Sequence, residues 1–161
     1  MGPYDGLLRE VILRMKYWEG EELADVVAVL WAREMASRLR EVQPDVVVPV
    51  PLHWMRRWRR GFNSPDVLAQ ALAYELGIPY MPHVVWRSRG TPQQTSQTSA
   101  TARHENVKNA FESQADAELL GKTLVLVDDV LTTGVTASEA ARALRIQKPK
   151  AIYVAVLAHG R

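Results

Sequence analysis

The chain has 161 residues, of which 47% are apolar and 24% charged, so it is long enough for a sizeable core and is not globally disordered. A formal net charge of only +2 gives no compositional reason to expect a nucleic-acid-binding protein. The sequence has no cysteine, no apolar run near the ~18 residues of a membrane span and no signal-peptide pattern, which excludes disulfides and thiolate zinc sites and is compatible with a cytoplasmic location.

The first part of the chain is predicted to form two helices packed on one domain. Apolar residues between positions 7 and 15 recur at spacings of three and four, which gives one apolar stripe. Gly20 interrupts this pattern, and a second helix is expected from about Glu21 to Arg40.

The middle of the chain contains a strand, a helix and a long polar stretch. The β-branched run 46–50 predicts a buried strand that ends at prolines, because proline cannot donate to a sheet ladder. Ser64-Pro65 predicts a helix start with Ser64 as N-cap, and Gly77 predicts the end of that helix. A short strand is expected at 83–86, and the polar residues 87–105 are expected to form a loop.

Two longer apolar runs complete the pattern. Residues 124–127 form a continuous apolar run, which suits a strand covered on both faces, and an Ala-rich helical segment begins near Ala137. Residues 151–158 predict a last buried strand. Strands that alternate with helices indicate an α/β fold with a mainly parallel sheet flanked by helices.

An acidic pair, Asp128-Asp129, follows the apolar run 124–127 directly. In open α/β sheets, ligands bind at the carboxyl ends of the strands. Ionised carboxylates accept hydrogen bonds from vicinal ribose hydroxyls, and they also hold Mg²⁺ beside a polyphosphate. The alternative is that one of the two acids only caps the following turn. The preceding strand and the threonine-rich sequence that follows favour a ligand site.

The residues after the acidic pair have the composition of a phosphate-binding turn. Backbone N–H groups at a helix N-terminus attract phosphate, glycine allows close approach of the backbone, and threonine hydroxyls add donors. Neither a Walker loop nor a Gly-x-Gly-x-x-Gly motif occurs, so NTP hydrolysis and a dinucleotide cofactor are disfavoured. The turn consists of Thr132, Thr133, Gly134, Val135 and Thr136.

A basic aromatic segment at positions 53–62 is compatible with several partners. Arginine binds phosphate with two parallel hydrogen bonds, and tryptophan stacks on bases, so single-stranded nucleic acid, diphosphate or a protein partner would each fit. A helix face with tryptophan inside and arginine outside would have the same composition. The residues concerned are Trp54, Arg56, Arg57, Trp58, Arg59 and Arg60.

Residues 125–136 resemble the phosphoribosyl diphosphate (PRPP) signature of type I phosphoribosyltransferases, and other segments narrow the resemblance to the ComF family of competence proteins. In family order, these segments are Lys16-Tyr17, Pro49-Val50-Pro51-Leu52-His53, Arg60-Gly61-Phe62-Asn63, Thr91-Pro92-Gln93, Arg103 to Val107, and Ala110-Phe111. Two departures stand out. The cysteine-rich zinc segment with which the family commonly starts has no counterpart here, because the sequence either begins after it or belongs to a member that lacks it, and zinc is therefore not carried over; Ser64 replaces the usual glutamine.

The resemblance implies a type I phosphoribosyltransferase-like fold in which residues 1–40 form a helical hood on a core of residues 41–161. It implies that Asp128 and Asp129 are the catalytic acids, which contact the ribose hydroxyls directly or through Mg²⁺ and water, and that turn 132–136 holds the 5′-phosphate. The diphosphate would face Pro51, Leu52, His53, Arg56 and Arg57. A flexible loop would carry Arg87, Arg89, Gln93 and Arg103.

The implied reaction is Mg²⁺-dependent transfer of phosphoribose from PRPP to an acceptor that the sequence does not identify. The alternative is a non-enzymatic competence factor that binds single-stranded DNA, or a helicase of DNA uptake, through residues 53–62. Whether the chain forms a homodimer is left open by the sequence.

Overall fold

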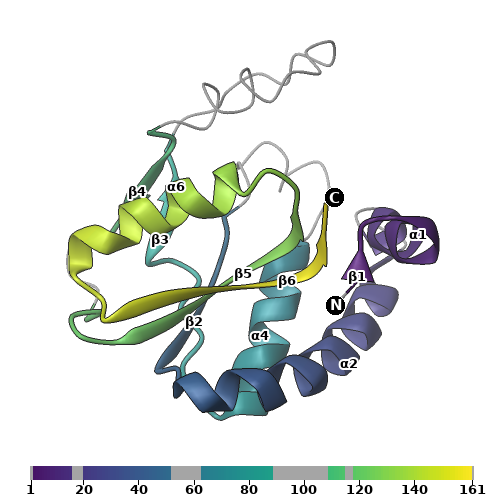
Figure 1. Ribbon diagram of the computed structural model, residues 1–161, viewed down its shortest axis with the longest axis horizontal. Helices are drawn as coiled ribbons and strands as arrows, with labels where there is room; N and C mark the ends of the chain where they lie inside the picture. Colours follow the sequence, from purple (N-terminus) through teal and green to yellow (C-terminus); the bar gives the residue numbers. More distant parts are fainter. Residues whose placement is uncertain (1, 16–19, 52–62, 89–108, 115–117, 161) are drawn as a thin grey trace.

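Four parallel strands form the centre of the molecule (Figure 1). The structure is a computed structural model that describes residues 2–15, 20–51, 63–88, 109–114 and 118–160. Neighbouring strands follow the order β1-β6-β5-β2, and each neighbouring pair is parallel. The strands are β1 (Gly2–Pro3), β2 (Val46–Pro49), β5 (Thr123–Leu131) and β6 (Ala151–His159).

Helices cover both faces of this sheet, as the apolar runs predict (Figure 1). Along β5, Val125 and Val127 pack into one cluster, whereas Leu124 and Leu126 pack into the other, because neighbouring side chains of a strand point to opposite faces. The first cluster includes α1 (Gly6–Met15), α2 (Glu21–Leu39) and α4 (Ser64–Leu76), and the second includes α6 (Val135–Leu144).

Helix α2 belongs to the same core as the strands. Its alanines, such as Ala28 and Ala32, are buried against the neighbouring elements, and the indole N–H of Trp31 donates to the carbonyl oxygen of Val156 in β6 at 3.1 Å. The short helix η2 (Arg40–Val42) follows α2 directly. The bounds of both N-terminal helices agree with the sequence, while their assignment as a hood stays a prediction. In the described part of the chain, no helix is long and apolar enough to cross a bilayer.

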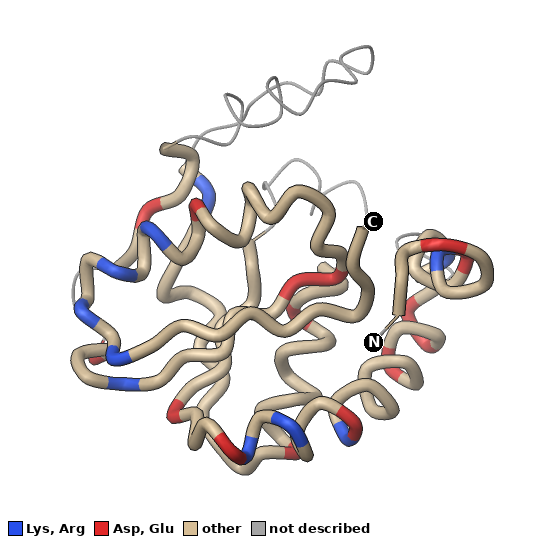
Figure 2. Tube along the Cα trace, viewed as in Figure 1, with Lys and Arg blue, Asp and Glu red and all other residues tan. Residues whose placement is uncertain are grey.

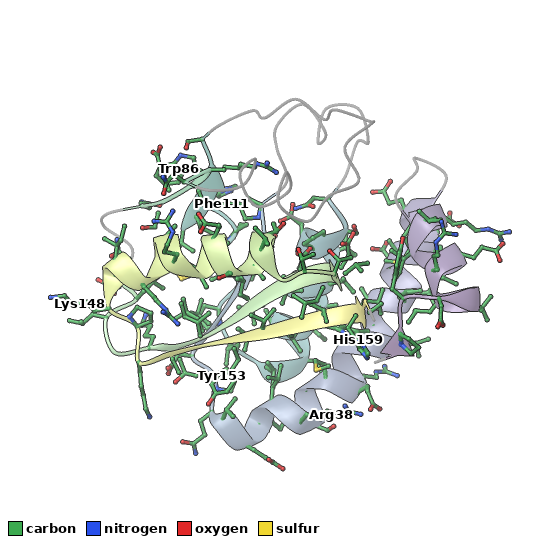
Figure 3. The ribbon with its side chains drawn as sticks, turned by 45° about the horizontal axis from the view of Figure 1, so that its top comes forward. Arg38, Trp86, Phe111, Lys148, Tyr153 and His159 are labelled. Carbon is green, nitrogen blue, oxygen red and sulfur yellow. The ribbon has the colours of Figure 1, made fainter. Side chains whose placement is uncertain are left out.

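The remaining strands form a separate pair. Strand β3 (Val85–Arg87) lies antiparallel to β4 (Phe111–Ser113), and the labelled Trp86 and Phe111 lie above α6 in Figure 3. The sequence therefore located β3 to within two residues but did not reveal its antiparallel partner. It also did not reveal β1, which is only two residues long, or η3 (Arg145–Gln147) after α6.

The start of α4 differs from the sequence-based expectation. Asn63 is the N-cap, with an extended backbone at φ −118° and ψ 111°, and Ser64 is already the first helical residue. The hydroxyl of Ser64 is not available for capping because it donates to a carboxylate of β5. The predicted end of the helix at Gly77 is confirmed, with φ at +67°.

Candidate functional site

The carboxyl ends of β2, β5 and β6 lie at one edge of the sheet, and the predicted acidic pair lies at this edge (Figure 2). Strand β5 continues to Leu131, so Asp128 and Asp129 are inside its last part rather than after its end. Pro49 is paired with Val127, and the N–H of Val50 donates to the carbonyl oxygen of Val127 at 2.8 Å. Pro51 follows Val50 in the chain, so the segment after β2 begins next to the part of β5 that carries the two acids.

The two carboxylates have different neighbours. Oδ1 of Asp128 accepts a hydrogen bond from the backbone N–H of Asp129 at 2.8 Å. Oδ2 of Asp129 accepts a hydrogen bond from the hydroxyl of Ser64, the first residue of α4, at 3.0 Å. Both acids are partly exposed, so each keeps access to solvent. The local backbone thus orients Asp128, and helix α4 orients Asp129.

The predicted phosphate turn connects β5 to the start of α6. Gly134 is the N-cap of α6 and has φ at +73°, a conformation that favours glycine. A Cβ at Gly134 would meet only Leu131 Cδ1, at 3.8 Å, so the backbone conformation rather than crowding requires the glycine. The turn surrounds a shallow hollow of about 20 Å³. Its lining runs from Val130 to Ala137 and also includes Asp128.

The chemistry of this turn is that of an anion site. The first N–H groups of an α-helix have no partner within the helix, and the helix dipole adds a partial positive charge there. Thr132 and Thr133 are exposed, and Thr136 lies in the first turn of α6. Hydroxyl and N–H donors therefore surround a hollow that has Asp128 on its rim.

Gly160 supports the turn from the end of β6, and sequence reasoning missed it. Its N–H donates to the carbonyl oxygen of Leu131 at 2.7 Å. A Cβ on Gly160 would lie 3.2 Å from the Cα of Thr132, closer than ordinary van der Waals contact. The only sign of this role in the sequence was a glycine shortly after the last apolar run. That glycine does not reveal that β6 ends beside the turn after β5.

Asn63 and Ser64 are two further site residues that the sequence did not assign to the site. Both residues are 4% exposed. Among the described residues, no donor reaches Oδ1 of Asn63. Pro51 and Asn63 are the described residues on either side of the basic aromatic segment, and their chain neighbours Val50 and Ser64 hydrogen-bond to Val127 and Asp129 of β5. The predicted residues Leu52, His53, Trp54, Arg56, Arg57, Trp58, Arg59 and Arg60 lie outside the described residues.

The base of the predicted flexible loop is the β3–β4 pair. The guanidinium carbon of Arg87 lies 5.8 Å from the centre of the Phe111 ring, and the N–H of Ser88 donates to the carbonyl oxygen of Ala110 at 2.9 Å. The role of Arg87 in neutralising diphosphate stays a prediction. Arg89, Gln93 and Arg103 lie outside the described residues.

A polar cluster joins this base to α6. The backbone N–H of Asn109 donates to Oε2 of Glu139 at 2.8 Å, and a guanidinium nitrogen of Arg142 donates to Oδ1 of Asn109 at 2.7 Å. The hydrogen bond from Arg142 to Glu139 raises the pKa of the Arg142 guanidinium above its usual value. The helix that begins at the phosphate turn therefore also fixes the residue shortly before β4.

Comparison with known proteins gives consistent matches. The family model described as "Phosphoribosyl transferase domain" matches residues 33–161. The chain is 40% identical over 147 residues to the DNA utilization protein YhgH of Salmonella typhimurium, covering 89% of this chain and 63% of that protein. It is 35% identical over 145 residues to competence protein F of Haemophilus influenzae, covering 89% and 62%. It is 28% identical over 154 residues to competence protein ComFC of Bacillus subtilis, covering 94% and 58%. The chain thus spans less than two thirds of the length of these relatives.

Solved structures share the fold. Glutamine PRPP amidotransferase of B. subtilis, complexed with ADP and GMP, matches with a TM-score of 0.54 and 21% identity, over 84% of this chain and 26% of that chain. The purine phosphoribosyltransferase of Pyrococcus horikoshii matches with a TM-score of 0.52 and 21% identity, over 89% of this chain and 75% of that chain. At these identities, the likeness shows the architecture alone.

Proposed function

The chain belongs to the phosphoribosyl transferase domain family, and we propose that the carboxyl edge of its sheet binds PRPP as the donor of a phosphoribosyl transfer. Its similarity to competence protein F and ComFC confirms the predicted resemblance to the ComF family, and the solved structures confirm the predicted fold class. The observation that carries the proposal is the continuity of the acidic end of β5, the Gly134 turn and the start of α6.

The two acids are suited to the ribose. Vicinal hydroxyls are donors, and ionised carboxylates are acceptors. Asp128 and Asp129 lie on consecutive positions of β5, so Asp128 faces the hollow of the turn and Asp129 faces Ser64 of α4. In this proposal, the ribose lies across the end of the strand, where a carboxylate from each side is within reach of its hydroxyls. Mg²⁺ fits this donor set, because proteins hold it with one or two carboxylates and leave other positions to substrate oxygens and water. Bound there, Mg²⁺ would neutralise charge on the diphosphate.

The turn is suited to the 5′-phosphate. Phosphate binds at helix N-termini, where backbone N–H groups point towards the ligand. Gly134 places the start of α6 shortly after β5, so the turn presents its donors a few residues beyond the acids. This spacing matches a ligand with hydroxyls in its middle and a phosphate at one end.

Transfer from PRPP breaks the bond between the ribose C1 and diphosphate, and the acceptor forms the new bond. Positive charge develops on the ribose ring while negative charge leaves with the diphosphate, so positioning and charge neutralisation are the main requirements. In this proposal, Pro51, Leu52, His53, Arg56 and Arg57 face the diphosphate. Arg87 at the end of β3 and Arg89, Gln93 and Arg103 of the segment that follows approach it. The acceptor is a separate question, because no described feature distinguishes one base from another.

Calorimetry with PRPP and Mg²⁺ tests this function. The unmodified protein should bind PRPP, and the double substitution Asp128→Asn and Asp129→Asn should abolish binding. Asp45→Asn is the matched control, because the Asp45 carboxylate accepts a hydrogen bond from the N–H of Thr123 at the opposite end of β5. Failure of the unmodified protein to bind PRPP, or equal binding by the double variant, would reject the proposal.

A second candidate function is binding of single-stranded DNA through the basic aromatic segment 53–62. It is supported by the composition of that segment and by the names of the relatives, which are DNA utilization and competence proteins. The described residues on either side of the segment, Pro51 and Asn63, are the chain neighbours of Val50 and Ser64, which hydrogen-bond to the end of β5. In this proposal, DNA or a helicase that accompanies it would bind next to the PRPP site.

Oligonucleotide binding at several salt concentrations tests the second candidate. Replacing Arg56, Arg57, Arg59 and Arg60 with alanine should abolish binding and flatten its salt dependence, because phosphate contacts release counterions. The control is a variant in which four other arginines, Arg9, Arg14, Arg38 and Arg145, are replaced with alanine. Equal loss of affinity in both variants would indicate a nonspecific charge effect and would count against the segment.

A further inference from the structure

Helices α2 and α4 lie on the face of the sheet opposite α6 (Figure 1). A groove of about 400 Å³ is lined by residues of both helices. Its lining includes the small side chains Ala28, Ala32 and Ala71. Two large side chains of the groove reach solvent: Val29 is 45% exposed and Tyr74 is 89% exposed. An almost fully exposed tyrosine beside an apolar groove is typical of an interface anchor, because its ring gains much from burial while its hydroxyl keeps a polar partner.

One side of the groove has a regular charge pattern. Asp25, Val29 and Arg33 all line the groove, and each is four residues from the next, so they form one stripe along α2. Charges of both signs occur along this helix (Figure 2). Within the part of the chain that the structure describes, neither Asp25 nor Arg33 forms an ion pair.

The stripe is complementary to itself. If two copies of α2 cross antiparallel with a twofold axis at Val29, Asp25 of each copy faces Arg33 of the other. Because Asp25 and Arg33 are equally far from Val29, the twofold axis brings both Asp25–Arg33 pairs together in the same arrangement. Such self-complementarity is what an isologous interface requires. We propose that the groove between α2 and α4 is the interface of a homodimer, with two Asp25–Arg33 pairs and Tyr74 of each copy against the apolar surface of the other.

The charge pattern favours a second copy over other occupants. A groove that receives a basic or an acidic peptide would have charges of one sign along its edge. Along α2 the acid and the base are placed symmetrically about an apolar centre. The other charged residue that lines the groove, Glu75 of α4, has its Oε1 3.9 Å from a guanidinium nitrogen of Arg40 in the same chain. The dimer also leaves the carboxyl edge of the sheet and α6 uncovered, because α2 and α4 cover the other face. The proposed PRPP site is therefore accessible in both copies, and the two proposals stand or fall separately.

Charge exchange gives a direct test by analytical ultracentrifugation of the full chain. Asp25→Arg alone and Arg33→Asp alone each place like charges opposite one another at both pairs, and each should weaken dimerisation about tenfold or more. An equimolar mixture of the two variants should form heterodimers, because each pair then joins an arginine of the first variant to an aspartate of the second. The double variant Asp25→Arg with Arg33→Asp should dimerise as the unmodified protein does.

Two further variants complete the test. Tyr74→Ala should also weaken the dimer about tenfold or more, because it removes the exposed anchor. Arg145→Asp, with the same charge change in η3 beyond α6, should leave the dimer unchanged. The proposal is overturned if the unmodified protein stays monomeric at about 100 µM, a concentration at which a specific interface of ordinary size is populated. It is also overturned if the single variants dimerise normally or if their mixture does not restore association.

Discussion

The hydroxyl of Ser64 donates a hydrogen bond to Oδ2 of Asp129 at 3.0 Å, although 65 positions separate the two residues in the chain. Ser64 begins α4, and Asp129 lies near the end of β5. The bond therefore ties one of the two proposed ribose-binding carboxylates to the helix that follows the basic aromatic segment. It involves the same Ser64 at which the sequence departs from the expected ComF pattern.

Ser64→Ala is expected to weaken PRPP binding about tenfold or more, because a hydrogen bond to a charged carboxylate contributes about 1.5–3 kcal/mol. Ser64→Thr keeps the hydroxyl and should retain most of the affinity. If Ser64 acts through Asp129, the loss should vanish when Ser64→Ala is made in a protein that already has Asp129→Asn. Calorimetry on the four proteins of this cycle measures the effect, and independent, additive losses would contradict it.

Gly134→Ala is expected to lower both stability and PRPP affinity. An alanine held in the left-handed conformation of Gly134 lowers the free energy of unfolding by about 1–2 kcal/mol. If the backbone instead relaxes to another conformation, the shape of the turn changes. Gly121→Ala is a matched control, since Gly121 has φ at +72° and a Cβ there would meet no atom within 4 Å. Both variants should unfold at lower urea concentration, but only Gly134→Ala should lose binding. Equal affinities would show that the turn does not hold the phosphate.

Gly160→Ala is expected to reduce PRPP affinity with little loss of stability. The added methyl group would press on the Cα of Thr132 from 3.2 Å and displace the turn by a few tenths of an ångström. Positioning errors of this kind weaken the binding of a small anion more than they weaken a packed core. Titration with PRPP, together with thermal unfolding, separates the two effects. A drop in melting temperature without a change in affinity would assign Gly160 to the fold alone.

Trp31→Phe is expected to destabilise the protein by about 1–3 kcal/mol, because it leaves the Val156 carbonyl without its donor in a buried place. PRPP affinity should be unchanged, since this contact lies between α2 and β6. Trp86→Phe is the control: Trp86 is 42% exposed, and its replacement should shift the free energy of unfolding by less than about 0.5 kcal/mol. Urea denaturation measures both, and equal stabilities would contradict the expected role of Trp31.

Local sequence determined most elements of this fold. The apolar run before Asp128 predicted the buried strand, the spacing of three and four predicted α1, Gly20 separated α1 from the helix expected after it, and Gly77 predicted the end of α4. These features depend on side-chain periodicity and on backbone preferences within one segment. Both can be read from consecutive residues of the sequence. The two-residue strand β1 was missed because it is too short for any periodicity.

The sequence by itself also determined the acidic pair and the threonine-rich turn, because the chemistry of the site lies in consecutive residues. Only the tertiary structure decided which distant residues support them. Ser64 looked like a helix cap until the fold brought Asp129 to its hydroxyl, and Gly160 had no role until β6 was placed beside the turn. The physical reason is that a hydrogen bond or a close backbone approach depends on which strands become neighbours. The order of the strands in the sheet depends on the packing of the whole core, and it cannot be predicted from a local sequence pattern.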